Sequence, residues 1–354
     1  LDARFFNDAL GVTFDWYNRT TSDILTTANL PATLGADAPY ENMGTIQTKG
    51  WELAIDYRHT FKNGLHFGVT ASVADDKTEV TKWTYNTKIP SYGATGWWDK
   101  SAYKEGMVLG DIWGLQFDRF LTEDDFNADG SLKAGLPDQT KVFPAGYQFA
   151  PGDVLYKDLD NNGEIVKQTN TNDKGDLSVI GNALPRLQFG LNLDAAWKGF
   201  DISMFFQGVA KRKLWAAGNQ VLPGFTTGEP FYKGAEDYWT PENTDAFYPR
   251  PMDYKQSASG NYSVNDRYLL NMAYLRLKTF TVGYSLPKVW LSKFKVQGLR
   301  VYFTGENLFT IDGVKPAIDP EIGIRTASGK SDQRNFGRSY PYQKTVSFGI
   351  QLSL

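Results

Sequence analysis

The sequence predicts an all-β protein, a transmembrane antiparallel β-barrel wall with long extracellular loops. Three observations support this fold class. Hydrophobic and polar residues alternate along eight segments, aromatic residues make up 15% of the chain, and the connections between segments are either very short or very long. Side chains on a strand point alternately to its two faces, so each segment has one apolar and one polar face.

The alternating segments run from near the first residue to the last. In the first, Leu10, Val12, Phe14 and Trp16 form the apolar side. In the sixth, the alternation changes phase near Thr279. The eight segments cover residues 10–17, 51–58, 65–74, 187–197, 200–207, 274–284, 299–306 and 346–354.

A soluble β-sandwich also has alternating strands, and it is the main alternative. The polar faces here mix Gly, Ser, Thr, Gln, Asp and Arg, which is typical of a water-filled lumen. Aromatic residues stand near segment ends, where a bilayer interface would hold them. They are Trp16, Trp51, Trp197, Phe200, Tyr284 and Phe348. Both observations favour the membrane barrel.

The lengths of the connections predict an orientation. The turns at 62–64 and 198–199 are tight, and 287–297 has an apolar and basic pattern suited to a short helical turn. Bacterial outer-membrane barrels have short periplasmic turns and long extracellular loops. We therefore expect four extracellular loops, at about 18–43, 77–186, 211–273 and 308–340.

With this assignment the eight strands run alternately up and down without contradiction. A further alternating piece, Trp113, Leu115 and Phe117, lies inside the longest connection. A spanning strand there would break the up-and-down order. We expect it to form part of a hairpin in a structured extracellular loop.

Composition excludes several classes of protein. The formal net charge of −3 gives no strong electrostatic attraction to nucleic acid, and the absence of cysteine excludes disulfide scaffolds and thiolate metal sites. No window approaches the ~18 consecutive apolar residues of a spanning helix. The start, Leu1-Asp2-Ala3-Arg4, has no signal peptide, and the strand pattern begins almost at once. This favours a chain that starts within a longer protein.

Several stretches, in order, resemble the SusC/RagA family of TonB-dependent outer-membrane transporters of the Bacteroidetes. One is Gly-Thr-Ile-Gln-Thr-Lys-Gly-Trp-Glu-Leu at 44–53, and another is Gly-Asp-Val-Leu-Tyr-Lys-Asp-Leu-Asp-Asn-Asn-Gly-Glu-Ile at 152–165. The remaining stretches are 105–114, 180–190, 198–208, 274–278, 283–287 and 299–309.

The resemblance implies that 1–354 are the C-terminal portion of the barrel domain, about the last eight strands of a barrel of about 22. The N-terminal plug domain would be absent from this chain. The family also implies a SusD-like lipoprotein lid and TonB–ExbB–ExbD acting through the missing N-terminal region. One departure is Leu354, where outer-membrane barrels usually end in an aromatic residue.

The sharpest local motif resembles a calcium-binding loop. Asp158, Asp160 and Asn162 stand at loop positions one, three and five, and Gly163 follows at six. Position twelve is Thr169 rather than an acid, and Asp173 or Asp176 would have to substitute. The alternative is a turn rich in Asp, Asn and Gly without an ion. A poorer match begins at Asp125, with Asn127 and Asp129.

No constellation in the sequence indicates an enzyme. His59 and His66 flank a predicted periplasmic turn with no third metal ligand nearby. Trp97 and Trp98, in the longest predicted loop, are the candidates for ligand contact, because aromatic faces stack on sugars and anchor interfaces. Packing inside a folded loop is an equal alternative. The sequence predicts no required cofactor, with a structural calcium ion as the one exception to consider.

Two functions of different classes remain open. By resemblance, the first is TonB-dependent import of a large nutrient, a glycan or a peptide, across the bacterial outer membrane. The second is a non-transporting surface protein that binds carbohydrate or mediates adhesion. A secreted glycosidase is a poorer third option.

Overall fold

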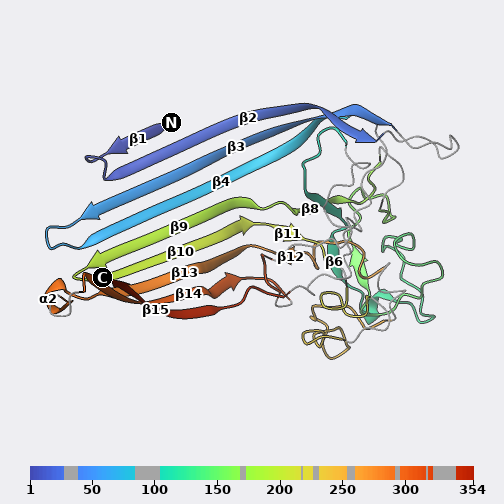
Figure 1. Ribbon diagram of the computed structural model, residues 1–354. Helices are drawn as coiled ribbons and strands as arrows, with labels where there is room; N and C mark the ends of the chain where they lie inside the picture. The colour runs from blue at the N-terminus through green and yellow to red at the C-terminus, as the bar shows by residue number, and fades with distance from the viewer. Residues whose placement is uncertain are drawn as a thin grey trace.

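The computed structural model is dominated by one antiparallel sheet of nine strands (Figure 1). It describes residues 1–27, 39–83, 104–167, 173–216, 218–225, 231–252, 260–291, 296–315, 318–321 and 340–354. The strands lie in the order β1-β2-β3-β4-β9-β10-β13-β14-β15. Their bounds are β1 Asp2–Phe5, β2 Leu10–Thr27, β3 Tyr40–Thr60, β4 His66–Trp83, β9 Arg186–Trp197, β10 Phe200–Lys211, β13 Tyr274–Ser285, β14 Gly298–Asp312 and β15 Thr345–Ser353.

All eight predicted strands are present in this sheet, each antiparallel to its neighbour. The sheet has a ninth member, β1, that the sequence did not predict. It pairs with the start of β2 across a turn in which Phe6, Asn7 and Asp8 have φ of 55°, 54° and 65°. Glycine is the residue normally expected in the left-handed backbone conformation. A phenylalanine at position 6 therefore gave no indication of a turn.

The first strands are longer than predicted. β2 continues to Thr27, β3 begins at Tyr40 and β4 ends at Trp83, so part of the connections expected at 18–43 and 77–186 is strand. The added ladder is rich in threonine, and the Thr48 and Thr78 hydroxyls lie 2.9 Å apart across β3 and β4. Threonine fits a strand well. These strands continue beyond the alternating apolar residues from which they were predicted.

The predicted turns follow from their residues. Lys198 and Gly199 both have positive φ, 48° and 89°, as a two-residue hairpin turn of the primed type requires. Between β3 and β4, the Leu65 amide donates to Asn63 Oδ1 at 3.0 Å. The 287–297 connection contains the short helix α2, Lys288–Leu291, as the apolar and basic pattern indicated.

The phase change near Thr279 is a β-bulge. The register of β13 against β14 shifts between Leu277 and Thr279, and its register against β10 shifts between Phe205 and Phe206. A bulge adds one residue to a strand and so reverses the facing of the residues beyond it.

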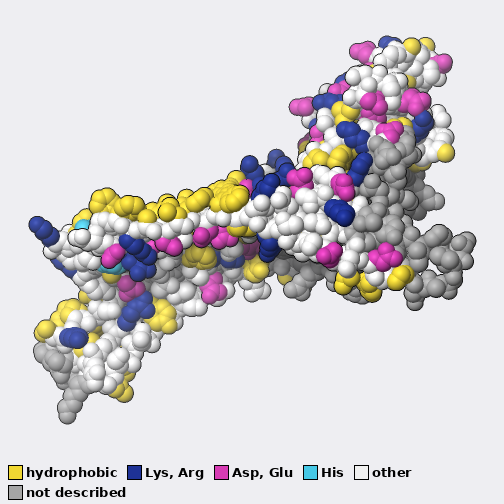
Figure 2. All heavy atoms as spheres, turned by 90° about the horizontal axis from the view of Figure 1, so that it is seen from above, with side chains coloured by type: hydrophobic (Ala, Val, Ile, Leu, Met, Phe, Trp, Pro, Cys, Tyr) yellow, Lys and Arg dark blue, Asp and Glu magenta, His cyan; other side chains and the backbone are white. Residues whose placement is uncertain are grey.

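The apolar face of the sheet is exposed. Trp16 is 64% exposed, Phe200 59% and Phe348 81%. Figure 2 shows hydrophobic side chains gathered in a band along the strands, with charged side chains beside it. A continuous exposed apolar surface of this extent marks a face made for lipid or another apolar partner. The sandwich alternative required these side chains to be buried between layers.

Beyond one end of the long strands, the connections fold into a second region with its own core (Figure 1). One cluster packs around Trp215, Leu222 and Met272, and another around Leu115 and Tyr156. The region contains β5 Asp111–Gly114, β6 Phe117–Phe120, η3 Glu123–Asp125, β7 Val154–Tyr156, β8 Ser178–Asn182, β11 Lys213–Leu214 and β12 Leu270–Asn271.

The alternating piece at Trp113, Leu115 and Phe117 lies in this folded region, as expected. It does not form one hairpin. β5 pairs with the distant β8, whereas β6 pairs with β7. Leu115, between β5 and β6, is fully buried. Among the described residues, no helix is long and apolar enough to cross a membrane.

Candidate functional site

The polar face of the sheet carries charged side chains that pair with one another across strands. Arg4 Nη1 lies 2.7 Å from Asp56 Oδ2, and Arg300 Nε lies 3.0 Å from Asp201 Oδ1. His66 Nε2 lies 3.5 Å from Asp194 Oδ2. These pairs lie near the ends of the strands that carry the short turns. They make this end of the polar face a surface of mutually paired charges.

Glycines on the same face make room for these side chains. A side-chain carbon at Gly68 would collide with the Asp194 carboxylate, and one at Gly283 would lie 2.5 Å from Arg300 Nη2. At Gly349 it would meet the ring of Tyr302. The long side chains therefore lie flat along the sheet, over the glycines of neighbouring strands. The neighbours of these glycines occupy the space above them.

A buried ionic network joins the sheet to the connection after β14. Arg276, on β13, is 3% exposed. Its Nη2 lies 2.7 Å from Asp319 Oδ1, and its Nη1 lies 2.5 Å from Glu321 Oε2. Lys278 Nζ donates to both Glu321 oxygens, at 3.0 and 2.9 Å. The Tyr342 amide donates to Asp319 Oδ2 at 3.0 Å. The described ends of this connection are thus fixed to the sheet.

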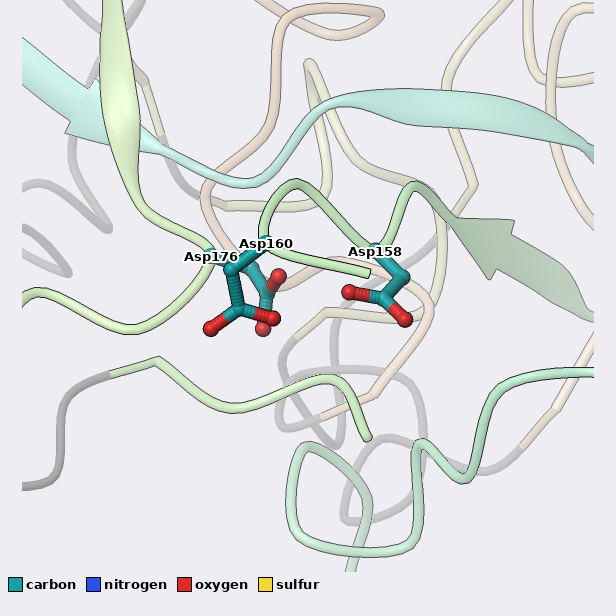
Figure 3. Close-up of side chains that lie close together, drawn as sticks. All are labelled: Asp158, Asp160 and Asp176. Atoms are coloured by element: carbon teal, nitrogen blue, oxygen red, sulfur yellow. The ribbon is translucent and has the colours of Figure 1, made fainter. Parts of the chain in front are cut away.

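The motif at Asp158 forms an acidic cluster in the folded connections. Asp158 and Asp160 follow β7, and Asp176 precedes β8. One carboxylate oxygen from each lies within 4.8 Å of the others. Figure 3 shows Asp160 and Asp176 side by side, with Asp158 facing them across the turn. Of the two acids considered as substitutes for Thr169, the structure brings Asp176 to the motif.

Backbone amides hold these carboxylates in place. The amides of Leu159 and Val166 donate to the two oxygens of Asp176, each at 2.8 Å. The Gly163 amide donates to Asp158 Oδ2 at 2.8 Å. Asn162, the third motif residue, donates from Nδ2 to Asp160 Oδ2 at 3.0 Å. The turn is therefore shaped by its own hydrogen bonds, as the alternative without an ion requires.

The pKa values of Asp160 and Asp158 are shifted in opposite directions. Desolvation raises the pKa of Asp160, and the nearby charges of Asp176 and Asp158 raise it further. Desolvation also acts on Asp158, but hydrogen bonds from the Gly163 and Asn162 amides lower its pKa overall. Clustered carboxylate and amide oxygens are the ligand type that Ca²⁺ takes. The donor set therefore fits a hard divalent cation.

The poorer motif at Asp125 has another role. Arg119 Nη1 and Nη2 donate to the two Asp125 oxygens at 2.5 and 2.7 Å, and the Thr122 amide donates to Oδ2 at 2.7 Å. The hydrogen bonds from Arg119 lower the pKa of Asp125 to about 2. Asp129 instead accepts from Ser131. The motif is a turn held by an ion pair, and its oxygens do not converge.

The other residues that the sequence singled out are two tryptophans and two histidines. Trp97 and Trp98 lie outside the described residues. His66 contacts Asp194 and Thr60, and the ring of His59 stacks on Tyr57. Within the part of the chain that the structure describes, the cluster at Asp158 is the one group of three or more candidate metal ligands.

Sequence reasoning missed the network around Arg276. Arg276 stands in an alternating strand and looks like any polar lumen residue, while Asp319 and Glu321 lie more than 40 residues away. The two pieces of sequence carry no local sign that they meet.

Comparison with known proteins gives consistent results. No protein-family model matches the sequence. TonB-dependent receptor P3 of Formosa agariphila is 27% identical over 364 residues, which cover 99% of this chain and 33% of that protein. TonB-dependent receptor SusC of Bacteroides thetaiotaomicron is 23% identical, over 100% of this chain and 31% of SusC.

Solved structures share the fold. A structure of the RagAB peptide transporter matches with a TM-score of 0.68 at 20% identity, over 99% of this chain and 34% of that chain. The RagAB peptide importer in its "open-open" state gives a TM-score of 0.66 at 18% identity, over 100% of this chain and 34% of that chain.

The chain spans about a third of the length of these relatives. The matched curated relatives are named as receptors rather than enzymes. Over nearly its whole length the chain is homologous to the TonB-dependent receptors, SusC among them, as its resemblance to the SusC/RagA family predicted, and its sheet has the fold of part of their β-barrel.

Proposed function

We propose that this chain forms part of the wall and outer loops of a TonB-dependent importer in the bacterial outer membrane. One observation carries the proposal: the sheet of a chain homologous to TonB-dependent receptors is apolar on one face and polar on the other. Within the described residues, its edge strands β1 and β15 are each paired on one side only.

The open edges favour a wider barrel. Backbone groups in hydrocarbon must all be hydrogen-bonded, so a spanning sheet has to close or to join further strands. A closed barrel of about eight strands has an interior filled by side chains. The polar face of this sheet has side chains lying flat over glycines, which suits the wall of a larger lumen. The family's plug domain would occupy that lumen.

The folded connections would face outward. The described parts of the connections after β4, β10 and β14 lie at the end of the sheet away from the tight turns (Figure 1). Their buried cores and the Arg276 network would support a surface on which a SusD-like lipoprotein lid docks. TonB–ExbB–ExbD would act through the N-terminal region and supply the energy for uptake.

The cargo would be a large nutrient, a glycan or a peptide. The RagAB structures are named as a peptide transporter and importer, which supports a peptide as one of the two classes. No covalent chemistry is proposed for any residue of this chain.

Uptake in living cells tests the function. The gene encoding this chain is deleted, and growth is measured on a panel of glycans and peptides as sole nutrient, in strains with and without TonB. We expect loss of growth on one nutrient class, and the same loss when TonB is removed. Normal growth of the deletion strain on every nutrient, combined with loss of attachment to a glycan-coated surface, would instead indicate the adhesion function.

We also propose that the acidic cluster holds a structural calcium ion. Asp158, Asp160 and Asp176 would supply carboxylate oxygens, and Asn162 would add Oδ1 on turning its side-chain amide, whose Nδ2 now donates to Asp160. Support comes from the convergence of three carboxylates within 4.8 Å and from the raised pKa of Asp160, because a divalent cation relieves this repulsion. The ion would fix the turn after β7 to the segment before β8.

A further inference from the structure

An aromatic cleft lies in the folded connections, away from the acidic cluster. We call it the Tyr248 cleft. Its volume is about 690 Å³, within the usual range for ligand pockets. Its lining, between residues 223 and 262, includes three prolines, a methionine, a phenylalanine and four tyrosines. It belongs to the long connection between β10 and β13, beyond the ends of the strands (Figure 1).

The base of the cleft is rigid. Tyr248 and Tyr262 are almost completely buried. The Tyr248 hydroxyl donates to the Val221 carbonyl at 2.9 Å. The backbone of Tyr248 is held on both sides, because its amide donates to the Asp237 carbonyl at 2.9 Å and its carbonyl accepts from the Trp239 amide at 3.0 Å. A ligand would meet a preformed surface, which lowers the entropic cost of binding.

The rim of the cleft is exposed to solvent, in contrast to its buried base. Phe231 is 64% exposed and Tyr238 is 40% exposed. Aromatic side chains left in water beside a preformed apolar cleft are the residue type that contributes most to binding energy. The lining also includes one side chain of each charge, Lys233 and Glu236.

The chemistry of the lining discriminates between ligand classes. A sugar carries many hydroxyl groups, and each hydroxyl buried without a partner costs free energy. Apart from tyrosine hydroxyls, the polar side chains among the described residues of the lining are Lys233 and Glu236, and the Tyr248 hydroxyl already donates to Val221. A wall of proline and tyrosine instead resembles the grooves in which proteins bind extended, proline-containing peptides.

We propose that the Tyr248 cleft binds an extended peptide segment through proline and other apolar side chains, with Lys233 and Glu236 available to pair with charged groups of the peptide. The role of that peptide as cargo rests on the proposed import function, whereas binding to the cleft does not. The proposal favours a peptide over a glycan at this site.

Binding to the purified full-length protein in detergent tests the proposal. The probes are a fluorescein-labelled ten-residue peptide of alternating proline and leucine, a Gly-Ser peptide of the same length, and maltoheptaose. The variants are Phe231→Ala and Tyr238→Ala, whose exposure allows substitution without loss of folding. Tyr340→Ala is the matched control, because Tyr340 is 96% exposed and does not line the cleft.

We expect the proline–leucine peptide to bind the native protein, and each cleft variant to weaken that binding about tenfold, as loss of an interface aromatic typically does. The control should bind like the native protein, and the Gly-Ser peptide should not bind. No binding of the proline–leucine peptide, equal binding by the cleft variants, or binding of maltoheptaose that the cleft variants weaken would overturn the proposal.

Failure of the two proposals can be told apart. If the peptide binds at the cleft but no nutrient depends on TonB and this gene for uptake, the import function fails and the binding site stands. If uptake depends on TonB and the cleft variants bind and import as the native protein does, the import function stands and the cleft assignment fails.

Discussion

At the scale of single residues, several charged side chains lie beside a neighbour that can neutralise them. Arg276 is almost fully buried and contacts two carboxylates, and each inner-face arginine described above has an aspartate partner. The cluster at Asp158, Asp160 and Asp176 differs, since no cationic side chain is among the hydrogen-bond partners that the structure describes for its three carboxylates. This imbalance leads to the first prediction.

Calcium should stabilise the acidic cluster. Adding millimolar Ca²⁺ to chelator-treated protein should raise the apparent Tm by several degrees, since an ion that binds only the folded state stabilises it. Asp160→Asn should abolish the rise, because it removes one carboxylate from the cluster. Asp160 is the residue to replace, because it accepts one backbone amide whereas Asp176 accepts two. Asp129→Asn is the control, as Asp129 lies in the motif whose oxygens do not converge. Equal Ca²⁺ responses in the native protein and Asp160→Asn would show that the cluster binds no ion.

The Arg119–Asp125 pair should make the stability of the folded protein depend on pH in the acidic range. The pKa of Asp125 is about 2 in the folded protein, below its ordinary value of 3.8. A lowered folded-state pKa adds stability that is fully present above the unfolded pKa and is lost as pH falls through the folded pKa, between about pH 5 and about pH 1.

Asp125→Asn should therefore cost about 1–2 kcal/mol at pH 6, a value below the full pKa shift because Arg119 is partly exposed. Near pH 1, below both pKa values, the variant and the native protein should be equally stable. Thermal unfolding at both pH values measures this difference. Asp118→Asn is the control, since Asp118 lies 4.0 Å from the same arginine. A penalty that is unchanged at low pH would rule out this titration.

At the scale of elements, strands could be predicted where apolar residues alternate, and could not where they do not. The bulge at Leu277 and Thr279 was visible as a phase change. The threonine-rich extensions of β2, β3 and β4 were not, because no apolar face marks them. β1 was missed because four residues are too short to show a period and its turn uses Phe6 at positive φ.

Among the candidate sites, only the acidic cluster could be predicted from the sequence, since two of its three carboxylates, Asp158 and Asp160, lie within one loop. Asp176 was considered only because the motif lacked its twelfth ligand. The Arg276 network joins residues more than 40 positions apart, and the Tyr248 cleft is formed by separate parts of one long connection, residues 223–262. Their existence depends on loop packing, which no local pattern encodes.

Close strand packing should make Gly208 hard to replace. A side-chain carbon there would collide with the Tyr274 backbone carbonyl and the ring of Phe189, and a backbone atom cannot rotate away. Gly208→Ala should destabilise the protein by about 1–3 kcal/mol. At Gly298 the nearest side-chain atom would be 3.6 Å away, an ordinary contact, so Gly298→Ala should have little effect. Thermal unfolding of the two variants compares them, and equal Tm values would contradict the packing argument.

At the scale of the whole molecule, the buried cores lie in the connections, and the sheet itself presents its apolar residues outward. This is the reverse of a sandwich, in which the alternating residues form the core. The two faces of one strand should therefore respond differently to the same substitution.

Leu191 and its neighbour Asn192, near the middle of β9, provide this comparison. Leu191 belongs to the apolar face and Asn192 to the polar face, where it is exposed. Leu191→Arg should cost about 2–4 kcal/mol, as arginine does on the lipid face near the bilayer midplane, and should lower the amount of protein assembled in the outer membrane. Asn192→Arg adds the same charge to the polar face and should assemble normally. Quantifying folded full-length protein in isolated outer membranes separates the two. Equal assembly of both variants would mean that neither face meets lipid, and the barrel interpretation of this sheet would then be wrong.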